Sequence, residues 1–157
     1  MKSTLIVGVG NSLMGADGIG WRVAEALWTD PRLPDDAEVL CGGTDLLRLS
    51  VKERRRVIIV DAALQGAAGP IPRTAHALSV PEAVALLKLE SPEVEFTLIA
   101  VPVDSVEFGD GLPPAVAAKV PEIVAKVIGA CRAAPNCSSE PSRNSESPTS
   151  SPSSATT

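Results

Sequence analysis

Two carboxylates and one imidazole are the side chains of this sequence best suited to act together in chemistry. Asp17 lies in a glycine-rich loop, Asp61 directly follows the apolar run 57–60, and His76 is the only histidine. In an open α/β sheet, ligands bind outside the carboxyl ends of the strands, which is where we expect all three residues. Such a set at one sheet edge suits a borderline divalent metal such as Ni(II), although copper and zinc would bind the same donors.

Each of these residues also has an explanation that involves no ligand. Asp17 would be stabilised near the N-terminus of the helix that follows the loop, because the helix dipole favours a negative charge there. Asp61 would accept hydrogen bonds from backbone amides of the following loop, and His76 would be a polar surface residue. The residue types alone leave these alternatives open.

The glycine-rich loop departs from both known phosphate-binding patterns. A dinucleotide fingerprint beginning at Gly8 would have a glycine at position 13, where this chain has Leu13. A P-loop would have Lys after Gly15, where Ala16 and Asp17 follow instead. Since the carboxylate of Asp17 would also repel phosphate, the sequence argues against a nucleotide site.

Apolar runs and turn residues predict alternating strands and helices. We expect strands over residues 4–9, 37–41, 57–60, 71–75 and 96–101. Helices are expected from Ile19, in a short segment near Asp45, from an N-cap at Ser79 to about Leu89, and over 115–133, where Pro121 should kink or divide the helix. This order predicts a three-layer α/β sandwich with a five-stranded, mostly parallel, twisted sheet flanked by helices.

The 157 residues fit one domain, which we place at 1–133. Residues 134–157 are rich in Ser and Pro and contain no aliphatic side chain larger than Ala. They cannot bury enough apolar surface to offset the entropy of ordering, so a disordered tail is expected.

Charge and cysteine usage narrow the partners and the compartment. The formal net charge of −5 argues against a nucleic-acid partner, and the basic run Arg54-Arg55-Arg56 is interpreted as a solvated turn. No apolar stretch is long enough to span a membrane, and the run 5–9 is too short for a signal sequence. The three cysteines, Cys41, Cys131 and Cys137, form no Cys-x-x-Cys motif. We therefore expect a cytoplasmic protein in a reducing compartment.

Five segments resemble a known family. Residues 8–20, Gly-Val-Gly-Asn-Ser-Leu-Met-Gly-Ala-Asp-Gly-Ile-Gly, resemble the N-terminal signature of hydrogenase maturation endopeptidases. In chain order, the resemblance continues through Gly42-Gly43-Thr44, the strand ending in Asp61, His76 with the helix after it, and the segment 111–116. It covers residues 4 to 133, and implies a phosphorylase/hydrolase-like fold.

The resemblance implies roles for particular residues. The family's three metal-contacting and catalytic positions correspond to Asp17, Asp61 and His76, and its substrate-binding turn corresponds to Gly42, Gly43 and Thr44. Ala16 stands where the family usually has the first of two acidic residues, so the acidic function of that loop is left to Asp17. The loop between Asp61 and His76 is short, which implies different substrate contacts there.

The resemblance also implies an activity. The expected enzyme is an endopeptidase, aspartic-type or nickel-assisted, that removes the C-terminal extension of a nickel–iron hydrogenase large-subunit precursor after nickel insertion. Nickel would be brought by the substrate, and no other cofactor is expected. We expect a monomer without nucleic-acid or membrane partners. Two alternatives remain: another metallohydrolase on the same scaffold, and a nickel-binding maturation chaperone without proteolysis.

Overall fold

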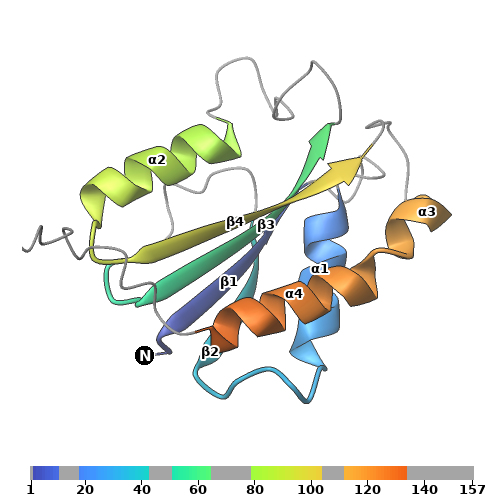
Figure 1. Ribbon diagram of the computed structural model, residues 1–157, viewed down its shortest axis with the longest axis horizontal. Helices are drawn as coiled ribbons and strands as arrows, with labels where there is room; N and C mark the ends of the chain where they lie inside the picture. Colours follow the sequence, from blue (N-terminus) through green and yellow to red (C-terminus); the bar gives the residue numbers. More distant parts are fainter. Residues whose placement is uncertain (1, 11–17, 43–50, 65–78, 104–111, 134–157) are drawn as a thin grey trace, which may run out of the picture.

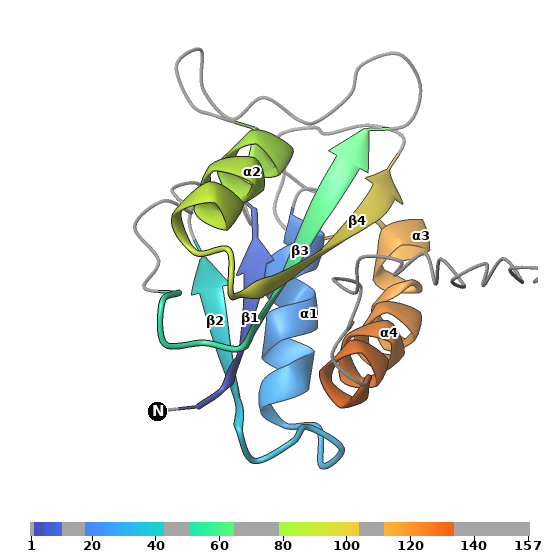
Figure 2. The ribbon, with the colours of Figure 1, turned by 60° about the vertical axis from the view of Figure 1, so that its left-hand side comes forward.

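The structure is a computed structural model that describes residues 2–10, 18–42, 51–64, 79–103 and 112–133. Its described strands are β1 (Thr4–Val9), β2 (Ala37–Gly42), β3 (Arg56–Leu64) and β4 (Glu95–Val103). They form one sheet in the order β2-β1-β3-β4, and every neighbouring pair is parallel. The arrowheads in Figure 2 accordingly point the same way, so all four carboxyl ends share one edge.

The described sheet has four strands rather than the predicted five. The additional strand was expected over 71–75, which lies outside the described residues, as does the short helix expected near Asp45. The four observed strands all agree in position with predicted ones. The coarser prediction of a parallel sheet flanked by helices is therefore confirmed.

Helices cover both faces of the sheet and give the three predicted layers (Figure 1). Helices α1 (Ile19–Trp28) and α4 (Val120–Arg132) pack on one face, and α2 (Val80–Glu90) packs on the other. Alternate residues of the central strands serve the two faces, since Ile6 and Ile58 pack toward α1 and α4 whereas Leu5 and Val57 pack toward α2. The core is thus two aliphatic clusters separated by the sheet.

Local sequence signals explain where the helices begin. At α2, Ser79 is the N-cap and forms a capping box with Glu82: the Glu82 amide donates to Ser79 Oγ at 3.3 Å and the Ser79 amide donates to Glu82 Oε2 at 3.0 Å. Pro121 divides the predicted last helix into α3 (Pro114–Ala117) and α4. Near the start of α4 its missing N–H needs no partner, which is why a proline is tolerated there.

The interpretation of the basic run as a solvated turn is wrong for two of its three residues. Arg55 is exposed, but Arg56 is 7% exposed and the Arg54 side chain is 9% exposed. Arg54 donates to Glu38 Oε2 at 2.6 Å, and Arg56 donates to Glu95 Oε2 at 3.2 Å. These arginines are buried because partners from other strands lie within reach, which charge counting along the chain does not reveal.

Within the described residues, no helix combines the length and the apolarity that crossing a membrane requires.

Candidate active site at the carboxyl ends of the strands

Asp61 is a buried acidic residue beside the carboxyl end of β1. It was predicted to end its strand, but β3 continues to Leu64 because β4 pairs with it as far as Leu64↔Val103. The pairing with β1 stops earlier, at Gly8↔Val60, so Asp61 is the first residue of β3 that is no longer paired with β1. It is 7% exposed. Because ligands of open α/β sheets bind outside the carboxyl ends of the strands, a carboxylate at this edge marks a candidate site.

Two glycines bring the first turn of α1 onto the strand ends next to Asp61. A Cβ on Gly20 would lie 2.4 Å from the Val9 carbonyl oxygen and 2.7 Å from the Val60 carbonyl oxygen. A Cβ on Gly8 would lie 2.1 Å from the Gly20 carbonyl oxygen. Any side chain at either position would force helix and sheet apart. These glycines therefore fix the start of α1 directly against the backbone that precedes Asp61.

The end of β2 is held by α1 as well. Gly42 is the last residue of β2, and its carbonyl oxygen accepts a hydrogen bond of 3.1 Å from the indole nitrogen of Trp21. A Cβ on Gly42 would lie 2.7 Å from Val7 Cγ1, so a side chain here would have to displace the fully buried Val7. Two consecutive residues, Gly20 and Trp21, thus contact the ends of β1 and β2 and the Val60 carbonyl of β3.

Two of the predicted site residues are described, and they lie at the same sheet edge. Asp61 and Gly42 stand near the carboxyl ends of β3 and β2, on either side of β1. Asp17, His76, Gly43 and Thr44 lie outside the described residues. Among the residues that are described, no group of three or more His, Cys, Asp and Glu side chains is placed to hold a metal ion. The predicted ligand set therefore stays a prediction, with one member placed.

Sequence reasoning missed Gly20 and Trp21 as residues that arrange this edge. The signal for Gly20 was present, since a glycine within the first turn of a helix lowers helix stability unless close packing requires it. No comparable signal pointed to Trp21, because its hydrogen bond joins segments 21 residues apart in the chain.

A cysteine nucleophile is disfavoured among the described residues. Cys41 directly precedes Gly42, but burial raises the pKa of its thiol, and the nearby Glu25 carboxylate raises that pKa further. Burial also raises the pKa of Cys131. Both thiols are therefore protonated near neutral pH, and a protonated thiol is a poor nucleophile.

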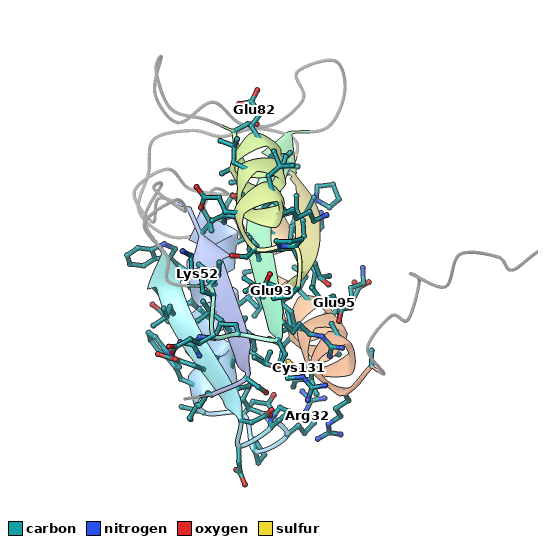
Figure 3. The ribbon with its side chains drawn as sticks, turned by 90° about the vertical axis from the view of Figure 1, so that its left-hand side faces the viewer. Arg32, Lys52, Glu82, Glu93, Glu95 and Cys131 are labelled. Carbon is teal, nitrogen blue, oxygen red and sulfur yellow. The ribbon has the colours of Figure 1, made fainter. Side chains whose placement is uncertain are left out.

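One cavity of the described surface is at the opposite end of the molecule. It has a volume of about 360 Å³ and lies by the amino ends of the strands. Glu93, Glu95 and Cys131, which contribute to its lining, are labelled in Figure 3. The cavity is lined by Ser3, Thr4, Asp36, Arg55, Arg56, Glu93, Glu95, Cys131 and Ala133. None of these residues belongs to the candidate site, so this cavity does not locate the chemistry.

The fold and this edge define a three-layer α/β protein with a buried carboxylate at the carboxyl end of a parallel sheet. No family model matches the chain. The hydrogenase 2 maturation protease of Escherichia coli is 31% identical over 148 residues, covering 82% of this chain and 90% of that protein. The structure of the hydrogenase maturating endopeptidase HybD from E. coli matches with a TM-score of 0.67 at 30% identity, covering 82% of this chain and 91% of that one. The [NiFe] hydrogenase maturation protease HybD from Thermococcus kodakarensis matches with a TM-score of 0.61 at 25% identity, covering 81% and 97%.

This chain therefore belongs to the hydrogenase maturation protease family, and it is a peptidase. The resemblance carried by the motifs of residues 8–20, 42–44 and 58–61 is confirmed by these matches.

Proposed function

We propose that this protein is the endopeptidase that removes the C-terminal extension of a nickel–iron hydrogenase large-subunit precursor once nickel has been inserted. Family membership supports the reaction class, since the relatives' names specify maturation proteases of hydrogenases. The observation that carries the proposal on this chain is the buried carboxylate of Asp61 at the carboxyl edge of the sheet. A carboxylate in such a place can accept a proton during hydrolysis.

In this proposal Asp17, Asp61 and His76 contact the nickel that arrives in the precursor. Two carboxylates and one imidazole leave coordination positions open for the substrate's own ligands, so recognition would require a loaded metal centre. Cleavage would then follow nickel insertion and not precede it. The turn of Gly42, Gly43 and Thr44 would let the substrate backbone approach closely, because glycines present no side chain.

Besides the substrate, the hydrolysis needs only groups of this chain and one water molecule. One of the two carboxylates takes a proton from water as its oxygen attacks the scissile carbonyl carbon. The carbon–nitrogen bond then breaks, and the leaving amine takes up the proton. The substrate's nickel supplies charge stabilisation at the carbonyl or the water. In aspartic-type hydrolysis the carboxylates would provide most of the activation, and in nickel-assisted hydrolysis the substrate's nickel would.

We also propose a monomer that acts in the cytoplasm, without a nucleic-acid or membrane partner. Cys41 and Cys131 both carry free thiols, which a reducing compartment preserves.

The test is to incubate the protein with the nickel-loaded large-subunit precursor from its own genome and to weigh the precursor by intact mass spectrometry. Wild type should remove a C-terminal peptide from the loaded precursor and leave the nickel-free precursor intact. Asp61→Asn, which keeps the side-chain shape and removes the charge, should leave the loaded precursor uncut. Asp30→Asn, at the other end of α1, is the matched control and should cleave like wild type.

Two other outcomes would each overturn the proposal. If metal and precursor bind while the precursor mass stays unchanged, the protein is a maturation chaperone. If unrelated peptides are cut as fast as the precursor, it is a metallohydrolase of another kind on this scaffold.

A further inference from the structure

Trp21 occupies a place that neither the family resemblance nor the proposed chemistry accounts for. It lies in the first turn of α1, is half-buried, and donates its indole N–H to the carbonyl oxygen of Gly42 at 3.1 Å. The preceding residue, Gly20, rests against the carbonyl oxygens of Val9 and Val60. The helix start that contacts the backbone next to Asp61 is therefore bonded through Trp21 to the end of β2.

The same helix offers an internal comparison. Trp28 also donates its indole N–H to a carbonyl oxygen of β2, that of Val39, at 3.0 Å. Seven residues of helix rise by about 10.5 Å, and three residues of strand rise by about 10 Å. The two indoles are thus spaced to reach two carbonyl groups of one strand. The bonds have the same chemistry, but Trp21 acts at the carboxyl end of β2 and Trp28 acts in its middle.

The position of the Gly42 carbonyl depends on this bond more than the position of the Val39 carbonyl does. Val39 is an interior residue of β2, with strand neighbours paired to β1 on both sides. Gly42 is the last paired residue, and as a glycine it has the widest backbone freedom. A terminal glycine without its indole partner would sample more directions, whereas Val39 would be held by the sheet.

We infer that Trp21 is a positioning residue for substrate binding: its indole fixes the Gly42 end of β2 relative to α1, and so presets the backbone that the precursor contacts. This inference rests on the proposed function, because it concerns the same site. Trp21 does not touch the reacting atoms. Its effect should therefore fall on binding of the precursor and leave the chemical step nearly unchanged.

The experiment compares Trp21→Phe with Trp28→Phe, since each removes one indole N–H and keeps an aromatic ring. Cleavage of the nickel-loaded precursor is followed at varied precursor concentration to separate KM from kcat. Trp21→Phe should raise KM by about tenfold, since small misplacements of a binding group cost this much or more, and kcat should stay within about twofold. Trp28→Phe should match wild type in both constants.

Measuring KM and kcat separately keeps a loss of folded protein from being mistaken for a loss of precursor binding. A smaller folded fraction lowers the apparent kcat but leaves KM unchanged, because KM does not depend on enzyme concentration. An unchanged KM in Trp21→Phe overturns the inference, and so does an equal rise of KM in both variants. Failure of wild type to cut the precursor would instead remove the proposed function.

Discussion

The two ends of the sheet are built by different means. At the amino ends, Arg56 donates to Glu95 and to the carbonyl oxygens of Ala130, Cys131 and Ala133 at the end of α4. At the carboxyl ends, glycines set the arrangement, and Asp61 is the buried charged residue among those that the structure describes there. One end is closed by charge-assisted hydrogen bonds, and the other is shaped by backbone contact.

This difference teaches where the fold can accommodate chemistry. The last carbonyls of a helix have no partner within the helix and carry partial negative charge. A buried arginine both donates hydrogen bonds to them and offsets that charge. Every group of that cluster is used for structure. At the carboxyl edge the glycines let α1 pack directly against the strands, and the buried Asp61 is the group that we propose acts on the substrate. We therefore expect exchange of a buried charged residue to change stability at the amino end and activity at the carboxyl end.

The largest effect should come from exchanging one carboxylate at each end. Asp61→Asn should lower cleavage of the nickel-loaded precursor by about 10²–10⁴-fold, the usual loss for a proton-transfer group. Glu95→Gln should leave cleavage unchanged and destabilise the fold by about 1 kcal/mol, since it weakens the charge-assisted bond to Arg56. Precursor mass spectrometry and urea unfolding measure the two quantities. If Glu95→Gln slows cleavage as much as Asp61→Asn does, the two ends of the sheet do not differ in function.

A methyl group at Gly20 tests whether backbone contact stabilises the carboxyl end. Gly20→Ala should destabilise the protein by about 3 kcal/mol, because overpacking against the Val9 and Val60 carbonyls forces the helix away from the sheet. Gly129→Ala in α4 is the matched control, since a Cβ there would meet no atom within 4 Å. It should stabilise the protein by about 0.5–1 kcal/mol through helix propensity. Equal effects of the two substitutions in urea unfolding would show that the contact at Gly20 is unimportant.

The sequence predicted features that depend on near neighbours in the chain. The strand over 4–9, the N-cap at Ser79 and the division at Pro121 follow from local patterns, and all three are confirmed. Features that depend on distant partners were missed. The burial of Arg56 requires the end of α4, and the true length of β3 requires β4. For the site, local motifs predicted Asp61 and Gly42 at one edge, but the bond between Trp21 and Gly42 arises only when the chain folds.

Arg56 tests the amino end directly. Arg56→Met keeps the apolar stem and should destabilise the protein by about 2–3 kcal/mol, because Glu95 and the carbonyls ending α4 lose their donor. The control is Arg22→Met, whose exposed partner Glu25 lies 3.5 Å away in the same helix. That substitution should cost no more than about 0.5 kcal/mol, as exposed pairs contribute little. Chemical unfolding of both variants decides the matter, and similar losses would contradict a special role for the buried arginine.

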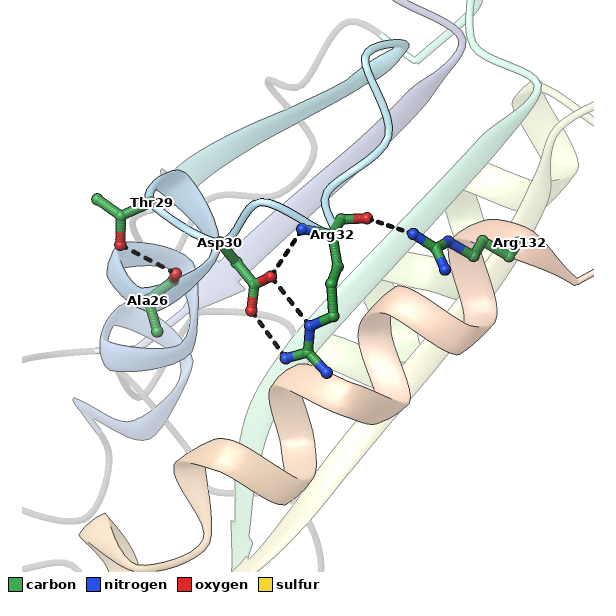
Figure 4. Close-up of polar contacts among 5 residues, drawn as sticks. All are labelled: Ala26, Thr29, Asp30, Arg32 and Arg132. Atoms are coloured by element: carbon green, nitrogen blue, oxygen red, sulfur yellow. Dashed lines mark hydrogen bonds and ion pairs between the residues drawn. The ribbon is translucent and has the colours of Figure 1, made fainter.

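The smallest expected effect concerns an exposed ion pair of the amino end, in contrast to the buried bonds of Arg56. Asp30 accepts from Arg32 Nε at 3.1 Å and from Arg32 Nη2 at 2.8 Å, and Arg132 donates to the Arg32 carbonyl oxygen (Figure 4). The hydrogen bonds from Arg32 lower the pKa of Asp30 from 3.8 to about 2. Because the folded-state pKa is depressed, the stabilisation is present above pH 3.8 and is lost as the pH falls toward 2. In solvent this contribution should be slight, and salt should reduce it further.

Carboxyl-carbon NMR titration of Asp30 measures that pKa directly. Arg32→Gln should return it toward the ordinary value, while Arg22→Gln, which removes a cation elsewhere on the surface, should leave it unchanged. Equal pKa values in wild type and Arg32→Gln would mean that the pair does not persist in solution. The polar bonds of the amino end would then matter only where they are buried, as at Arg56.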